Sequence, residues 1–203
     1  MKIYIYLFVI LTMVFSSHKP KDKFYLHKNG VTCRCPNTTP GEKGFINGIE
    51  FESVDNDLLR QRIDEEVDIT KLCTSLVTDM SKIFMGLGYR TFNQPIGHWD
   101  VSNVTNMSSM FSDTQFNQSI GDWDVSKVTD MSSMFRSTEF NQPIGDWDVS
   151  NVKYMEEMFR NSQFNQNISK WCVTKITREP EGFSNNSPLT PENKPKWGTC
   201  PNN

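Results

Sequence analysis

The chain has 203 residues, of which 36% are apolar and 22% are charged, a composition typical of one folded globular or repeat domain rather than of a disordered chain. Its formal net charge is −3 and its sequence pI is about 5.6. Basic residues cluster only at Lys19, Lys21 and Lys23, whereas a nucleic-acid reader usually carries a broad basic patch. We therefore exclude nucleic acid as a partner.

The first 17 residues have the three-part pattern of a secretory signal peptide. Lys2 precedes a 13-residue apolar run at 3–15, and Ser16 and Ser17 follow it before the chain turns polar. The run is too short to span a bilayer comfortably, and its alternative interpretations are an N-terminal anchor or a buried strand. We expect a secreted or cell-surface protein whose mature chain, from about residue 18 onward, has no transmembrane segment.

Five cysteines fit an exported protein, because disulfides persist in oxidising compartments. Cys172 and Cys200 bracket the C-terminal tail and are expected to pair, which stabilises the fold by roughly 3–4 kcal/mol through loop closure. Cys73 is then expected to pair with Cys33 or Cys35, and we take Cys33 as its partner. Zinc is the alternative, but these cysteines lack the paired spacing of a zinc ribbon.

The segment 24–70 is predicted to be an N-terminal cap. Two Asn-Gly pairs, at 29–30 and 47–48, are typical of tight hairpin turns that need positive φ angles. Three polar residues at 55–57 offer caps to a short helix over 58–65. A repeat array needs such a cap, because its terminal unit otherwise leaves apolar surface and backbone groups open to water.

A 24-residue repeat occupies the middle of the chain. The motif Phe-Asn-Gln-x-Ile-Gly-x-Trp-Asp-Val-Ser begins at Phe92, Phe116 and Phe140 and, truncated, at Phe164. The first two full units are identical at 17 of 24 positions, and such self-similarity indicates a solenoid whose units bury their apolar faces only against neighbours. A degenerate copy precedes them, so we place the repeats at 71–176 and a C-terminal cap at 177–203.

Each unit mixes two periods of apolar residues. In the unit 116–139, the segment 123–125 alternates as a short strand does, whereas the apolar residues of 128–135 recur at spacings of three and four, as in a short helix. Stacked strands would form a parallel sheet along one side. The sequence therefore predicts an α/β repeat solenoid with one short parallel strand and one short helix per repeat.

The polar face of the predicted strand is the candidate binding site. In an alternating strand Trp and Val share the buried face, so the tryptophan column is assigned to the core rather than to sugar stacking. The opposite face carries His98, Asp100, Ser102, Asp122, Asp124, Ser126, Asp146, Asp148 and Ser150. We call these nine residues the Asp/Ser strip.

Five carboxylates on this strip must be hydrated or must hold cations. Neighbours about 4.8 Å apart repel by ~0.9 kcal/mol in water and by many times more in a dry environment. A solvated face without a ligand, a partner-binding face and a Ca²⁺-binding face are the three interpretations. Carboxylates and hydroxyls suit Ca²⁺, but the sequence contains no recognised calcium loop, so we assign no metal ligands.

The residues at 99–111, Trp-Asp-Val-Ser-Asn-Val-Thr-Asn-Met-Ser-Ser-Met-Phe, together with Phe-Asn-Gln-Pro-Ile-Gly at 92–97, resemble the repeat of BspA-like leucine-rich-repeat surface proteins of bacteria. The resemblance covers about 72–176. It implies a right-handed leucine-rich-repeat coil in an exported, cell-surface-associated protein, and relatives of this kind bind host or matrix proteins. No site residue transfers from the family, because the shared motif is structural.

No catalytic constellation stands out in the chain. It has three histidines and lacks a nucleophile elbow, a zinc-protease helix and a phosphate-binding loop. We predict a non-enzymatic surface or secreted repeat protein without a cofactor, which mediates adhesion or binds an extracellular, host or matrix protein through the Asp/Ser strip. The alternative is a calcium- or glycan-dependent binding module.

Overall fold

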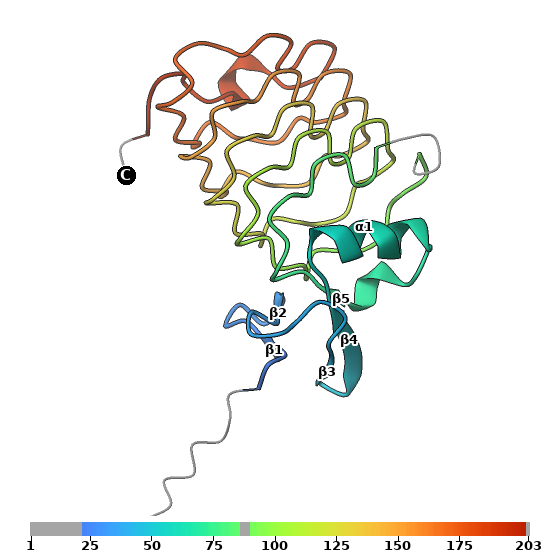
Figure 1. Ribbon diagram of the computed structural model, residues 1–203. Coiled ribbons are helices and arrows are strands. Elements are labelled where there is room, and N and C mark those ends of the chain that lie inside the picture. The colour runs from blue at the N-terminus through green and yellow to red at the C-terminus, as the bar shows by residue number, and fades with distance from the viewer. Residues whose placement is uncertain (1–21, 86–89, 202–203) are drawn as a thin grey trace, which may run out of the picture.

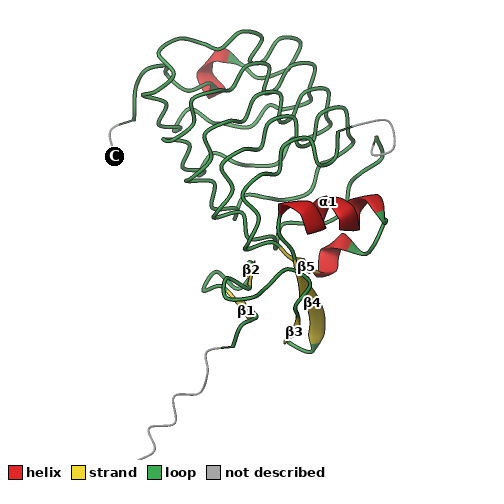
Figure 2. Cartoon of the chain, viewed as in Figure 1, coloured by secondary structure: helices red, strands yellow, loops and turns green. Residues whose placement is uncertain are grey.

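The computed structural model describes residues 22–85 and 90–201 (Figure 1). The predicted signal peptide lies outside these residues and stays a prediction. Most regular secondary structure precedes the repeats, and turns and loops form nearly all of the described repeat region (Figure 2). The described elements are β1 (Tyr25–Leu26), β2 (Cys33–Arg34), β3 (Lys43–Ile46), β4 (Ile49–Ser53), α1 (Asn56–Asp64), η1 (Ile69–Lys71), β5 (Leu72–Cys73) and η3 (Pro191–Asn193).

Two antiparallel hairpins and one helix form the segment before the repeats. The pairs β1–β2 and β3–β4 turn at the two Asn-Gly sequences, and in the second turn Asn47 and Gly48 have φ angles of 51° and 80°. Asp55 caps α1 by accepting the N–H of Leu58 at 3.0 Å. The short β5 adds in parallel to β4, which joins the hairpin to the start of the repeats. The predicted domain boundaries themselves stay predictions.

Backbone hydrogen bonds stack each repeat on the next. The N–H of Met107 donates to the carbonyl of Asp130 at 2.9 Å, and that of Met131 donates to the carbonyl of Tyr154 at the same distance. Parallel bridges accordingly join Asp79 to Asn106, Asn106 to Asp130, and Asp130 to Tyr154. Successive turns of the chain therefore lie side by side along the repeat region (Figure 1).

The strand and helix predicted within each repeat are both absent from the three full repeats at 92–163, and only the degenerate first copy contains a strand, β5. The ladder runs along the segment predicted as helix, whereas Trp-Asp-Val merely connects two turns. In the ladder, Met110 donates back to the carbonyl of Met107, while Ser109 donates to Ser132 of the next repeat. Ser109 has a φ of 55°, which an α-helix cannot accommodate. The three- and four-residue spacings thus reflect a series of tight turns.

Buried aromatic rings form a periodic ladder through the repeats. Phe111, Phe135 and Phe159 are parallel, with successive centroids 5.8 and 5.7 Å apart, and Phe116 stacks on Phe111 at 3.9 Å. The repeat tryptophans and methionines are also buried, which confirms that both columns belong to the core. Large rings in register bury apolar area against the equivalent ring of each neighbour, so the core extends along the whole stack.

Two disulfides tie the ends of the described chain to the repeats. Cys172 pairs with Cys200, as predicted. Cys73 pairs with Cys35, so the assignment of Cys33 was wrong, and Cys33 is a buried free thiol. The sequence could not choose between them because residues two apart on an extended segment share a face. The N–H of Cys35 donates to Ser75 Oγ at 2.9 Å, which places Cys35 beside Cys73.

Glycines at the corner before Trp99, Trp123 and Trp147 allow the repeats to approach closely. A Cβ on Gly145 would lie 2.5 Å from the carbonyl oxygen of Asn167 in the next repeat, and one on Gly97 would lie 2.6 Å from that of Ser119. The equivalent distance at Gly121 is 3.0 Å. These are backbone neighbours, which cannot swing aside as a flexible side chain does, so an added methyl group must separate the repeats.

We expect Gly145→Ala to lower the free energy of unfolding by about 1–3 kcal/mol, because the added methyl group overlaps a backbone carbonyl. Gly121→Ala should have a smaller effect, since its contact is looser. Urea denaturation followed by tryptophan fluorescence measures both variants. Equal stability of Gly145→Ala and the wild type would contradict close packing at this corner.

We expect Cys33 to be unreactive in the folded chain. Burial raises the pKa of its thiol to about 11, so little of the nucleophilic thiolate forms near neutral pH. A thiol-specific reagent should label none of the native protein and one cysteine per chain after denaturation without reductant, and peptide mass spectrometry should locate the label at Cys33. Rapid labelling of the native chain, or a label on Cys35, would contradict the observed pairing.

Candidate functional site

The Asp-x-Ser segment of each repeat is a local turn held by the aspartate side chain. Asp124 Oδ1 accepts the N–H of Ser126 at 3.2 Å and its hydroxyl at 2.6 Å. Asp148 Oδ1 accepts the N–H of Ser150 at 3.0 Å. Such Asx turns satisfy backbone donors that no neighbouring strand reaches. The recurrence of Asp and Ser therefore has a structural cause, whatever else these residues bind.

Asp100 is not on the surface, and its assignment to an exposed strip was wrong. The residue is 4% exposed, and its Oδ2 accepts from Ser75 Oγ at 2.6 Å and lies 3.5 Å from Arg34 Nε. Oδ1 makes the turn contact with the hydroxyl of Ser102 at 2.7 Å. The segment containing β2 covers this end of the strip and supplies both the guanidinium and the burial. Asp100 thus joins the N-terminal segment to the repeats.

His98 lies in the same covered region and is half-buried. Its carbonyl accepts the N–H of Cys33 at 2.8 Å, and its ring packs edge-on against Phe51 with centroids 6.0 Å apart. Burial lowers the pKa of His98, and contacts with the backbone of Thr70 and the charge of Asp68 oppose that effect more weakly. The ring therefore favours its neutral form in the folded chain.

The accessible carboxylates of the strip lie in the second and third full repeats. They belong to Asp122, Asp124, Asp146 and Asp148. None of the four forms an ion pair within residues 22–85 and 90–201. The strip serines are half-buried, and the hydroxyl groups of Ser102 and Ser126 donate to their own aspartates. The structure thus exposes four of the five carboxylates, whereas the N-terminal segment covers His98 and Asp100.

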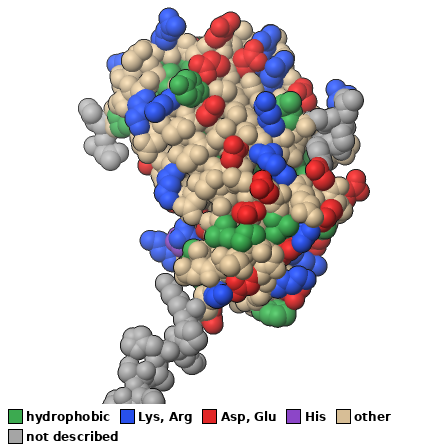
Figure 3. Space-filling view, viewed as in Figure 1, with side chains coloured by type: hydrophobic (Ala, Val, Ile, Leu, Met, Phe, Trp, Pro, Cys, Tyr) green, Lys and Arg blue, Asp and Glu red, His purple; other side chains and the backbone are tan. Residues whose placement is uncertain are grey.

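Lysines beside the strip form contacts that the sequence analysis missed. Lys127 Nζ donates to Asn103 Oδ1 of the preceding repeat at 2.7 Å, and Lys175 Nζ donates to Asn151 Oδ1 at 2.6 Å. The sequence feature that could have revealed these contacts is the alternation of Asn and Lys at one repeat position, 103, 127, 151 and 175. These cations moderate the negative potential near the strip. One face of the molecule indeed shows acidic and basic side chains interspersed (Figure 3).

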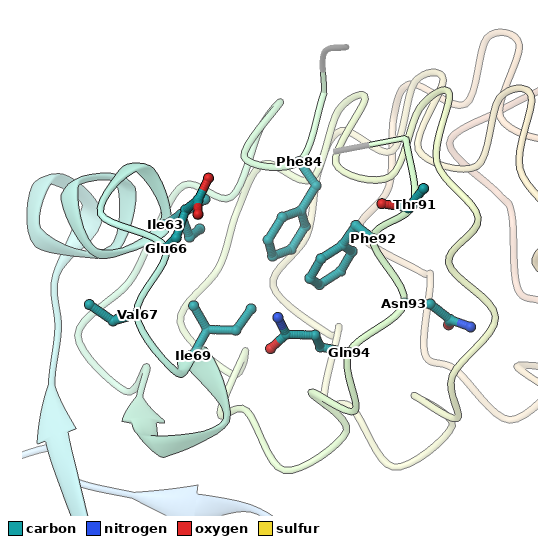
Figure 4. Close-up of a pocket in the computed structure, with 9 residues that line it drawn as sticks. All are labelled: Ile63, Glu66, Val67, Ile69, Phe84, Thr91, Phe92, Asn93 and Gln94. Atoms are coloured by element: carbon teal, nitrogen blue, oxygen red, sulfur yellow. The ribbon is translucent and has the colours of Figure 1, made fainter. Parts of the chain in front are cut away.

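Several hollows among the described residues adjoin the repeats, and two of them bear on a possible site. One, of 240 Å³, is lined partly by Asp122 and Asp146 at the glycine corners. The other, of 350 Å³, lies where Ile63 and Val67 face Phe92, and Glu66 is its only ionisable described residue (Figure 4). Neither gathers acids, bases and nucleophiles as an active site does. No group of three or more potential metal-ligating residues exists in the described chain.

Comparison with protein families gave two overlapping matches to one family model, whose description is "Mycoplasma protein of unknown function, DUF285". The matches cover residues 56–171 and 88–197, which together exceed half of the chain. They include α1, all full repeats and most of the tail. No curated protein and no solved structure matched.

We expect the stability of the folded chain to depend on pH through His98. Because its folded pKa is lower than the ordinary 6.5, the contribution of the neutral ring is complete above about pH 6.5 and is lost as the pH falls through the folded pKa. As the pH falls below about 6.5, the free energy of unfolding should therefore decrease more steeply for the wild type than for His98→Gln.

The comparison isolates His98 because the carboxylates are common to both chains. Glu52, whose pKa is lowered by a hydrogen bond from Arg62, changes both curves alike. Denaturant titrations at several pH values give the two slopes. Parallel curves would show that protonation of His98 does not disturb its contact with the N-terminal segment.

Proposed function

The chain belongs to the family described as "Mycoplasma protein of unknown function, DUF285", and on that premise we propose that it is an exported, non-enzymatic repeat protein that binds a protein partner. The contact surface is the accessible part of the Asp/Ser strip, namely Asp122, Asp124, Asp146 and Asp148. The repeats in this proposal form a solenoid of the BspA-like leucine-rich-repeat kind, which their sequence resembles.

Export is supported by the cysteine chemistry. Two disulfides connect segments that are 38 and 28 residues apart in sequence, and such bonds persist in oxidising compartments. The apolar run at 3–15 supplies the expected targeting signal. No described helix is long and apolar enough to cross a membrane. We therefore propose a secreted or surface-associated location, with an extracellular, host or matrix protein as partner.

The observation that carries the binding proposal is that the four carboxylates are accessible and form no ion pair within the described chain. They are exposed and lack ionic partners in the described chain, yet the backbone beneath them is held by Asx turns and by the inter-repeat ladder. A rigid row of charges loses little conformational entropy when it meets a complementary surface. The partner surface should accordingly be basic, and charge attraction should accelerate its association.

The absence of enzymatic activity is part of the same proposal. Its support is that Asp124 and Asp148 recur as equivalent turn residues in successive repeats, whereas acid–base catalysis needs paired groups whose environments set different pKa values. A repeated, solvent-exposed carboxylate fits recognition better than turnover.

The test replaces charge while it preserves the turns. We expect Asp124→Asn/Asp148→Asn to reduce capture of the partner from extracellular protein material roughly tenfold, because Asn retains the Oδ1 acceptor but removes the charge. Quantitative mass spectrometry of proteins retained by the immobilised mature chain gives the readout. Asp122→Asn/Asp146→Asn tests the other exposed pair in the same way.

A matched control removes two exposed carboxylates elsewhere on the repeats. Asp113→Asn/Glu139→Gln changes the net charge equally, at residues that line a different hollow. We expect it to capture as much partner as the wild type. If the control and the strip variants lose partner capture equally, the loss is explained by net charge alone. If both strip variants capture as much partner as the wild type, the strip is not the binding surface.

A further inference from the structure

Differences between the second and third full repeats concentrate on the inter-repeat ladder. The units 116–139 and 140–163 differ at nine positions, and four of these lie within 153–157. There Lys153, Tyr154, Glu156 and Glu157 replace Thr129, Asp130, Ser132 and Ser133. The ladder bonds are unchanged, since residues 131 and 133 donate to residues 154 and 156 as residues 107 and 109 donate to 130 and 132. The scaffold therefore does not require these replacements.

Only some of the replacements have partners within the described chain. Glu157 forms ion pairs with Arg136, at 3.2 Å, and with Arg160, and Glu156 accepts the hydroxyl of Ser132 at 3.2 Å. The side chains of Lys153 and Tyr154 make no hydrogen bond or ion pair with any described residue. Packing and hydrogen bonding thus leave Lys153 and Tyr154 unexplained.

Tyr154 is an exception among the aromatic residues of the repeats. It is 53% exposed, whereas the repeat phenylalanines and tryptophans are buried in the aromatic ladder. An accessible tyrosine on a rigid backbone is a typical anchor of protein interfaces, because a large ring is buried at a small loss of side-chain entropy. Asp130, at the same position one repeat earlier, offers no such surface.

The charged side chains near Tyr154 indicate which kind of partner group this surface would bind. Lys153 is exposed without a counter-ion among the described residues, and Arg136 and Arg160 share the single carboxylate of Glu157. With Glu156 and with Asp130, the ladder partner of Tyr154, included, three cations face three carboxylates, so the charges of this part of the ladder balance. The group that is complementary to an anion is thus the exposed ammonium of Lys153, whereas the accessible part of the Asp/Ser strip carries only carboxylates.

We propose that Lys153 and Tyr154 form a recognition site for an acidic segment of a protein partner, which places a carboxylate against Lys153 Nζ and an apolar side chain on the ring of Tyr154. The inference rests on the proposed binding function and deepens it. The Asp/Ser strip attracts a basic surface, while this pair selects which partner stays bound. The strip requires a basic surface on the partner, whereas Lys153 and Tyr154 require an acidic segment, so separate variants can test the two contacts.

The test exchanges the pair for the residues of an earlier repeat. Lys153→Thr/Tyr154→Asn copies Thr105 and Asn106, which occupy the same positions in the first full unit. The probes are synthetic peptides that each contain one phenylalanine and are otherwise acidic, neutral or basic. Fluorescence anisotropy with the full mature chain should show the tightest binding for the acidic peptides, and the exchange should weaken that binding roughly tenfold.

Lys127→Asn is the matched control. It also removes one exposed lysine, and Asn occupies that position in the units before and after it. It should bind the acidic peptides as the wild type does, and both variants should melt within a few degrees of the wild type. Loss of acidic-peptide binding in the exchange variant alone supports the site.

Two outcomes would overturn the inference. One is a wild-type chain that binds acidic peptides no better than basic ones, and the other is an exchange variant that binds them undiminished. Partner capture separates this failure from failure of the proposed function. If neutralising the strip abolishes capture while exchange of Lys153 and Tyr154 does not, the strip proposal stands and this one falls.

Discussion

Every repeat depends on backbone hydrogen bonds to the repeats on either side of it, and this ladder constrains the rest of the structure. Donors such as Met107 and Ser109 reach equivalent carbonyls one unit later, so the chain must return to the same position every 24 residues. That requirement explains the glycines at the corners, where carbonyls approach too closely for a Cβ, and the aspartates that close the turns. It also explains why the rings lie in register, because a displaced repeat would lose ladder bonds and ring contacts together.

A ladder of this kind must end without exposing unpaired backbone groups, which would recruit other chains. At the first end, the side chain of Asn56 in α1 accepts the N–H groups of Thr78 and Asp79 at 2.8 and 3.1 Å. At the other end, Phe183 and Asn185 donate back within their own turn rather than outward. The array is thus closed by two different devices.

The sequence was sufficient for the features that depend on repetition and insufficient for those that depend on contacts between distant segments. The period, the buried columns and the hairpin turns follow from local patterns. A spacing of three and four residues, however, arises in a helix and in a series of tight turns alike, and only the left-handed φ of residues such as Ser109 separates them. The burial of Asp100 was likewise hidden, because Arg34 approaches it from a segment 66 residues earlier. For the same reason the choice between Cys33 and Cys35 required their neighbours in space.

Internal repetition also supplies a criterion for function that a single-copy domain lacks. A residue that is identical in each full unit makes the same local contact in each unit, so its recurrence is explained by the fold before any ligand is considered. Asp124 and Asp148 satisfy this structural demand by closing their turns, and their exposed charge is additional to it. Tyr154 satisfies no such demand, since Asn106 and Asp130 maintain the same ladder without a ring. Within one chain, departures from the repeat at exposed positions therefore carry more information about recognition than the repeat itself.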